Sequence, residues 1–179
     1  MLSLHIPDFE KLTWVVFDYS HSRHSALHGV HHWQCVAWTG YHLMQEVPDC
    51  DPVVVLLFGL LHDSMRLTDL GDPEHGKRGG QFARWLFDKG HLEGISSTQL
   101  DLLQIACTDH SDGYTSKDPT IGVCWDADRL NLWRIGIRPS SALMSTDAAK
   151  KDSRIQWARK LQSQRFEWKT ISKEFSRLL

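Results

Sequence analysis

The sequence has few cysteines and almost no excess charge, and each shortage excludes a class of protein. Its four cysteines contain no Cys-x-x-Cys pair, which argues against a disulfide scaffold and against a cysteine-based zinc site. The formal net charge is -2 with neutral histidine, so no overall attraction to nucleic acid or to a membrane surface is expected. We therefore expect reduced thiols in a cytoplasmic protein that has no nucleic-acid partner.

Long apolar runs are also missing. The longest run, 53–61, is far shorter than the roughly 20 residues that span a bilayer. The first 12 residues lack a basic flank followed by an apolar stretch, so no signal peptide is expected. The sequence predicts no membrane contact.

Strand signals are scarce as well, because no segment alternates apolar and polar residues for long. Apolar residues recur instead at helical spacing. The sequence predicts helices at about 12–19, 32–47, 52–64, 74–88, 98–110 and 119–133, irregular chain over 134–148, and one or two amphipathic helices over 148–179. The expected fold class is all-α: a single-domain helical bundle over 1–179, with its core at about 25–135.

Histidine is abundant, with 11 residues, and four of the histidines are expected on buried, apolar parts of helices. The predicted helix 52–64 is apolar on all sides and should be central, yet it ends in His62 and Asp63. A buried ionised carboxylate is costly unless it has a cation or strong hydrogen bonds. His32 lies on the apolar stripe of its own helix, and helical spacing places Asp128 on the buried face of 119–133. His75 and His110 lie on further apolar stripes.

The order of these residues resembles a known signature. The segments HGVHHW, HDSMR, DPEHGKR and CWDADRL are similar to motifs of the HD-domain superfamily of metal-dependent phosphohydrolases, and they cover about 25–135. The resemblance implies an all-helical HD-type fold with one divalent transition metal held by His32, His62, Asp63 and Asp128. Imidazole nitrogen and carboxylate oxygen suit Mn, Fe, Co, Ni or Zn, with Mg as an alternative.

Such a site favours hydrolysis. A water bound to a transition metal has its pKa lowered from ~15.7 toward ~7. The expected activity is therefore hydrolysis of a phosphate ester, on a nucleotide or a similar small phosphorylated metabolite. Asp63 is a candidate both as ligand and as the residue that orients the water. His75 and His110 are candidates as general acid, substrate contact or second-metal ligands.

Four further residues are candidates for substrate binding. Arg66, Arg78 and Arg129 could grip a phosphate through two parallel hydrogen bonds. A salt bridge to a ligand carboxylate is the alternative, which stays open for Arg66 and is favoured for Arg129. His28 stands one helical turn before His32 and could contact either the substrate or a ligand.

Two other functions remain open. Some HD-fold proteins hold two irons and activate O₂, and His75 with His110 could complete a second site bridged by Asp63. Alternatively, the protein could be a non-catalytic sensing module that keeps the metal. A homodimer is also left open, because no interface is marked in the sequence.

Overall fold

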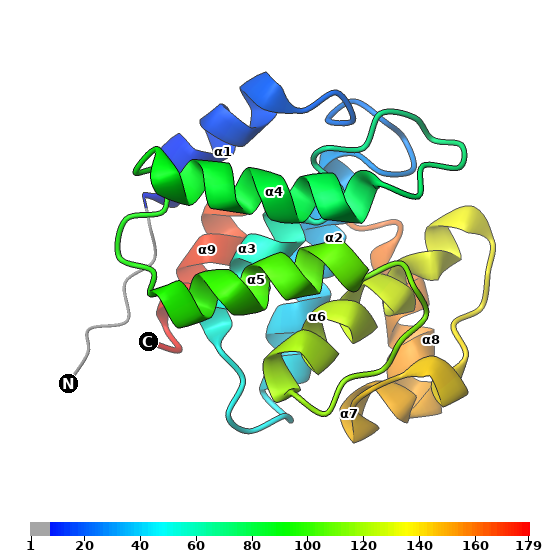
Figure 1. The fold of residues 1–179 in the computed structure, drawn as a ribbon. Helices are drawn as coiled ribbons and strands as arrows, with labels where there is room; N and C mark the ends of the chain where they lie inside the picture. Colours follow the sequence, from blue (N-terminus) through cyan, green and yellow to red (C-terminus); the bar gives the residue numbers. More distant parts are fainter. Residues whose placement is uncertain (1–7) are drawn as a thin grey trace.

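The computed structural model describes residues 8–179, and the described chain is helical with no β-strand (Figure 1). The all-α prediction is confirmed. The elements, in chain order, are α1 (Phe9–Tyr19), α2 (Val30–Met44), α3 (Pro52–Leu61), α4 (His75–Asp88), α5 (Ser97–Asp109), α6 (Pro119–Leu130), the 3-10 helices η1 (Asn131–Ile135) and η2 (Ser141–Leu143), α7 (Asp147–Lys150), α8 (Asp152–Leu161) and α9 (Trp168–Ser176). Within residues 8–179, every helix is too short or too polar to span a bilayer.

Two Asp-Pro pairs start the helices that matter most for the site. The Asp51 side chain accepts hydrogen bonds from the amides of Val53 and Val54, and Pro52 occupies the first turn of α3. Asp118 caps α6 in the same way. Aspartate satisfies amides that have no partner within the helix, and proline has no amide to satisfy there. These caps fix where α3 and α6 begin.

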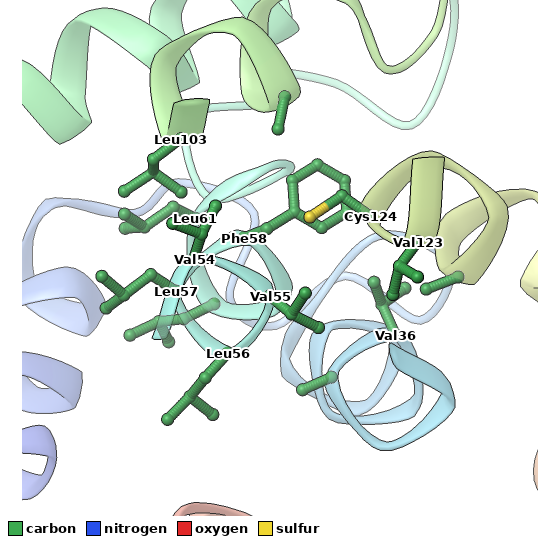
Figure 2. Packing of buried hydrophobic residues seen from close by; sticks show 14 of the residues in the cluster. Val36, Val54, Val55, Leu56, Leu57, Phe58, Leu61, Leu103, Val123 and Cys124 are labelled. Carbon is green, nitrogen blue, oxygen red and sulfur yellow. The ribbon is translucent and has the colours of Figure 1, made fainter. Parts of the chain in front are cut away.

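Helix α3 is the centre of the molecule. Every residue from Val53 to Leu61 is buried. In Figure 2, α3 lies between residues of other helices, with Leu103 from α5 on the side of Leu61 and Val36 from α2 on the side of Val55. This arrangement explains why the sequence of α3 is apolar on all sides, since no face of the helix reaches water.

The C-terminal part differs in detail from the sequence prediction. The stretch 134–148, expected to be irregular, includes η2 and the start of α7, and the amphipathic region divides into α8 and α9. The interruption at 162–167 lets the two helices pack on different neighbours. Helix α8 packs against η1 and α6, whereas α9 packs against α1, α2 and α3.

The crossing of α2 and α3 depends on a glycine. A Cβ atom at Gly59 would lie 2.6 Å from Cβ and 2.8 Å from Cα of Ala37. We expect Gly59→Ala to lower the free energy of unfolding by about 1–3 kcal/mol, because a methyl group would overpack this contact. At an open helix position the same change would stabilise the protein. Urea denaturation measures the effect, and Gly71→Ala is the matched control because it has open space. An unchanged midpoint for Gly59→Ala would contradict this account of the packing.

Candidate metal centre

Five helices bring histidine and aspartate side chains to one point at the carboxyl end of α3. His62 and Asp63 directly follow α3 and are buried, at 0% and 2% exposure. The other residues come from elsewhere in the chain and are also buried: His32 from α2, His75 from the first position of α4, His110 from the end of α5 and Asp128 from α6. The structure therefore brings together all the residues that the sequence predicted as metal ligands or catalytic groups.

The four predicted ligands form the first half of this cluster. Nε2 of His32 lies 3.5 Å from Oδ2 of Asp63 and 3.2 Å from Oδ1 of Asp128. Nε2 of His62 lies 3.7 and 3.8 Å from the same two oxygens. The two imidazole nitrogens are 3.1 Å apart. The ligand atoms of His32, His62 and Asp63 lie within 4.8 Å of one another, and Oδ1 of Asp128 lies beside both imidazole nitrogens.

The second half of the cluster uses the other oxygen of Asp63. Oδ1 of Asp63 lies 3.3 Å from Nε2 of His75 and 3.7 Å from Nε2 of His110. These two imidazole nitrogens are 3.0 Å apart. Asp63 is therefore shared: each of its oxygens faces a different pair of histidines, and each half could hold a metal ion.

The orientation of the imidazole rings fits a metal. Nδ1 of His62 faces the Phe58 carbonyl, Nδ1 of His110 faces the Cys107 carbonyl, and Nδ1 of His75 faces the Asp72 carbonyl. A carbonyl only accepts hydrogen bonds, so each Nδ1 must donate. In a neutral ring the lone pair is then on Nε2, which points into the cluster.

Metal ions would also satisfy atoms that have no other partner. Nε2 of His75 and Nε2 of His110 lie 3.0 Å apart, and two lone pairs at this distance need either a proton or a metal ion between them. Burial opposes a charge on His110, but Asp63 and Asp128 raise its pKa overall. Oδ1 of Asp63 and Oδ1 of Asp128 are buried without a hydrogen-bond partner in residues 8–179. Such buried polar atoms are costly unless they are compensated.

The electrostatics of the cluster keep its carboxylates charged. Burial opposes the charge on Asp63, but the adjacent imidazoles of His62, His110 and His32 hold its pKa well below the ordinary value. Burial similarly opposes ionisation of Asp128, and His32 and Arg134 lower its pKa overall. Burial lowers the pKa of His62 to about 3. A charged carboxylate and a neutral imidazole are the forms that bind metals.

A cleft of about 320 Å³ connects the cluster with solvent. It is lined by His28, Asp63, Arg66, His75, His110, Ser111, Gly113, Asp128, Arg129, Leu132, Arg134 and Leu143. Of the four residues predicted to bind substrate, Arg66, His28 and Arg129 are in this lining and Arg78 is not. A small molecule could therefore reach the cluster from this side.

Two predicted substrate arginines have other partners. Arg78 donates to the Met65 carbonyl and to the Asp72 carboxylate, which anchors the loop before α4. Arg129 donates to the carbonyls of Leu143 and Tyr114, so it ties two loops together at the wall of the cleft. The ion pair that the sequence favoured for Arg129, with Asp128, is absent from the described residues, and Arg129 lies 3.9 Å from Asp126 instead. Each guanidinium is held by loop atoms that sequence spacing does not reveal.

Sequence reasoning missed two residues of the cleft region. Arg134 lies 3.9 Å from Oδ1 of Asp128, at the start of the stretch expected to be irregular. Asp69 accepts hydrogen bonds from Nδ1 of His28, at 2.9 Å, and from the Ser25 hydroxyl. Both residues reach the site through tertiary contacts, and no motif marked them.

The helical arrangement is that of an HD-type fold, as a comparison with solved structures shows. It is similar to the structure of a predicted HD superfamily hydrolase from an uncultured Thermotogales bacterium, with a TM-score of 0.61 and 20% sequence identity. The match covers 99% of this chain and 94% of that one. No family model matches the sequence, and no curated protein matches it. The resemblance inferred from the motifs is thus confirmed at the level of the fold.

Proposed function

We propose that the protein is a metal-dependent phosphohydrolase that cleaves the ester bond of a small phosphorylated metabolite, such as a nucleotide, in this cleft. The observation that carries the proposal is the shared carboxylate of Asp63, which lies between two pairs of imidazoles at the floor of the cleft. The HD fold is consistent with it, since the similar solved structure is described as a predicted hydrolase. We further propose a cytoplasmic location, supported by four free cysteines.

The geometry favours two metal ions over the single ion that the motifs implied. His32, His62, Asp128 and Oδ2 of Asp63 would hold the first ion, and His75, His110 and Oδ1 of Asp63 would hold the second. When bound, such ions activate water as a nucleophile and polarise phosphoryl oxygens. Mn, Fe, Co, Ni and Zn suit this donor set, with Mg as an alternative.

The protein's own side chains supply charge and a proton. Arg66 donates to the carbonyls of Thr68 and Leu70, which holds its guanidinium at the cleft, with Nη1 3.7 Å from Oδ1 of Asp63. His28 lines the cleft, and its Nδ1 donates to Asp69. Because Nδ1–H is held by Asp69, Nε2 of His28 carries a proton only when the ring is an imidazolium, and in that form it would protonate the departing oxygen of the ester. Burial lowers the pKa of His28, while Asp69 opposes that shift, which favours proton release into the cleft.

Metal analysis combined with a substrate screen tests this proposal. The purified protein, loaded with Mn, Fe, Co, Ni or Zn in turn, is expected to bind two ions per chain and to hydrolyse phosphate esters. A protein that binds metal and hydrolyses no phosphate ester with any of these ions would contradict the proposed activity and favour the sensing module.

A di-iron oxygenase is the second candidate, because a carboxylate shared by two pairs of histidines would serve two irons equally well. Absorption spectroscopy separates the two functions. A preparation that holds only iron, absorbs in the visible range and consumes O₂ would favour the oxygenase.

The effect of removing the proton donor should depend on the leaving group of the substrate. We expect His28→Gln to slow hydrolysis of an alkyl phosphate about 100-fold and that of p-nitrophenyl phosphate only a few-fold, because nitrophenolate leaves without protonation. Steady-state kinetics measures both substrates. His24→Gln is the control, since His24 does not line the cleft. Equal losses on the two substrates would rule out this role for His28.

A further inference from the structure

Arg134 is held rigidly at the wall of the cleft. Its Nε donates to the Leu27 carbonyl at 2.8 Å, and its Nη1 donates to the Asn131 carbonyl at 3.1 Å. The side chain is 11% exposed, and Nη1 lies 3.9 Å from Oδ1 of Asp128. Nη2 donates to no other residue in the described chain, 8–179. A fixed guanidinium with one unused nitrogen beside the metal centre is suited to an anion.

Arg66 has the equivalent position beside the other carboxylate. Two of its guanidinium nitrogens hold loop carbonyls, and the third, Nη1, has Asp63 at 3.7 Å as its nearest charged partner. Its side chain is 12% exposed. The two arginines come from different segments, after α3 and within η1. One arginine guanidinium therefore lies beside each of the two carboxylates of the cluster.

The rest of the lining makes the cleft cationic. Asp63 and Asp128 are the only carboxylates that line it in the described chain, against three arginines. Arg129 is committed to two carbonyls, so Arg66 and Arg134 have the guanidinium nitrogens available for a ligand. Leu132 and Leu143 add an apolar wall without charge. Metal ions on the two carboxylates would add further positive charge.

We infer that the cleft selects the dianion of a phosphate monoester over a phosphodiester, with Arg66 and Arg134 gripping the phosphoryl group from two sides. This inference rests on the proposed phosphohydrolase function. A monoester has three terminal oxygens and nearly two negative charges at neutral pH, so it can serve both arginines and still offer an oxygen to the metal centre. A diester has two terminal oxygens and one charge, and it leaves one of these cationic groups uncompensated.

The reaction that follows is simple hydrolysis. The oxygen of water forms a bond to phosphorus, the phosphorus–oxygen ester bond breaks, and inorganic phosphate leaves. The alcohol oxygen takes a proton from His28. The attacking water releases a proton, and this proton returns His28 to its protonated form. Leu132 and Leu143 would contact the organic group of the ester, which should be uncharged.

Two substrates with the same leaving group test the selectivity. We expect kcat/KM for p-nitrophenyl phosphate to exceed that for methyl p-nitrophenyl phosphate. Arg134→Gln should reduce the monoester value about 10- to 100-fold and the diester value less than about 3-fold. Arg138→Gln is the matched control, since Arg138 is exposed and pairs with Asp152. A wild-type preference for the diester, or equal losses on both substrates in Arg134→Gln, would overturn the inference.

Ligand binding tests the same inference without turnover. With equal metal content verified, calorimetry should show that Arg134→Gln weakens the binding of inorganic phosphate about tenfold or more and leaves that of dimethyl phosphate nearly unchanged. Arg134→Lys keeps the positive charge and should lose less phosphate affinity than Arg134→Gln. It therefore provides the test if the glutamine variant does not fold. Unchanged phosphate affinity in both variants would overturn the inference. If the wild type hydrolyses neither ester yet binds phosphate through Arg134, the proposed activity fails and the anion selectivity stands.

Discussion

Replacing Asp63 by alanine is expected to empty both halves of the metal centre and to reduce phosphate-ester hydrolysis to the background rate. Asp63 is the one residue that belongs to both groups of ligands, with Oδ2 facing His32 and His62 and Oδ1 facing His75 and His110. Its loss also leaves four inward-facing imidazoles with only Asp128 as a counter-charge. Metal analysis by plasma mass spectrometry, together with activity on p-nitrophenyl phosphate, measures the outcome.

The controls for this variant separate chemistry from folding. Asp63→Asn keeps the shape of the side chain but removes its charge, so we expect the same loss of metal with a smaller effect on folding. Asp101→Ala changes an exposed aspartate on α5 and should keep both ions and full activity. Circular dichroism verifies that each variant is helical. Retention of two ions by a folded Asp63→Ala protein would refute the assignment of Asp63 as a shared ligand.

The parts of the site on regular helices could be predicted from the sequence. Helical spacing alone placed Asp128 on a buried face, and the apolar run before His62 indicated that Asp63 is buried. Both inferences work because a helix fixes the direction of each side chain relative to its neighbours. The Asp-Pro starts of α3 and α6 were equally visible, since the capping interaction is local.

The residues on loops could not be predicted in the same way. Arg78 was proposed as a phosphate ligand because it follows His75 closely, yet its guanidinium binds the loop through Asp72. Arg134 and Asp69 were missed because their positions depend on contacts with Leu27 and His28, which are distant in sequence. In an irregular segment, the spacing of residues along the sequence does not indicate where their side chains point, so only the folded structure reveals these contacts.

The roles of His75 and His110 were also left open by the sequence. The motifs implied four ligands for one ion, and a second site on these two histidines, bridged by Asp63, was one of several alternatives. Their rings meet only because the start of α4 lies beside the end of α5, as Figure 1 shows for these two neighbouring helices. The glycines of α4 permit this approach, since a Cβ atom at Gly76 would lie 2.5 Å from the carbonyl oxygen of Thr108.

Removal of His110 should therefore separate the two halves of the centre. We expect His110→Gln to retain one ion per chain, on His32, His62, Asp63 and Asp128, and to lose the second. His75 and a single oxygen of Asp63 are too few ligands to hold an ion tightly. Hydrolysis should fall at least about 100-fold, because a two-metal site stabilises both the attacking and the leaving oxygen.

The electron paramagnetic resonance spectrum of the manganese-loaded protein distinguishes this outcome from general damage to the site. Two manganese ions close enough to share the Asp63 carboxylate are magnetically coupled, whereas a single ion gives an isolated six-line signal. The wild type should show the coupled spectrum and His110→Gln the isolated one, while His31→Gln, whose ring contacts the Gln164 carbonyl, should resemble the wild type. Loss of both ions together would mean that His110 supports the whole cluster, and retention of two ions would mean that it is not a ligand. Either result would contradict a centre in which one carboxylate joins two separable sites.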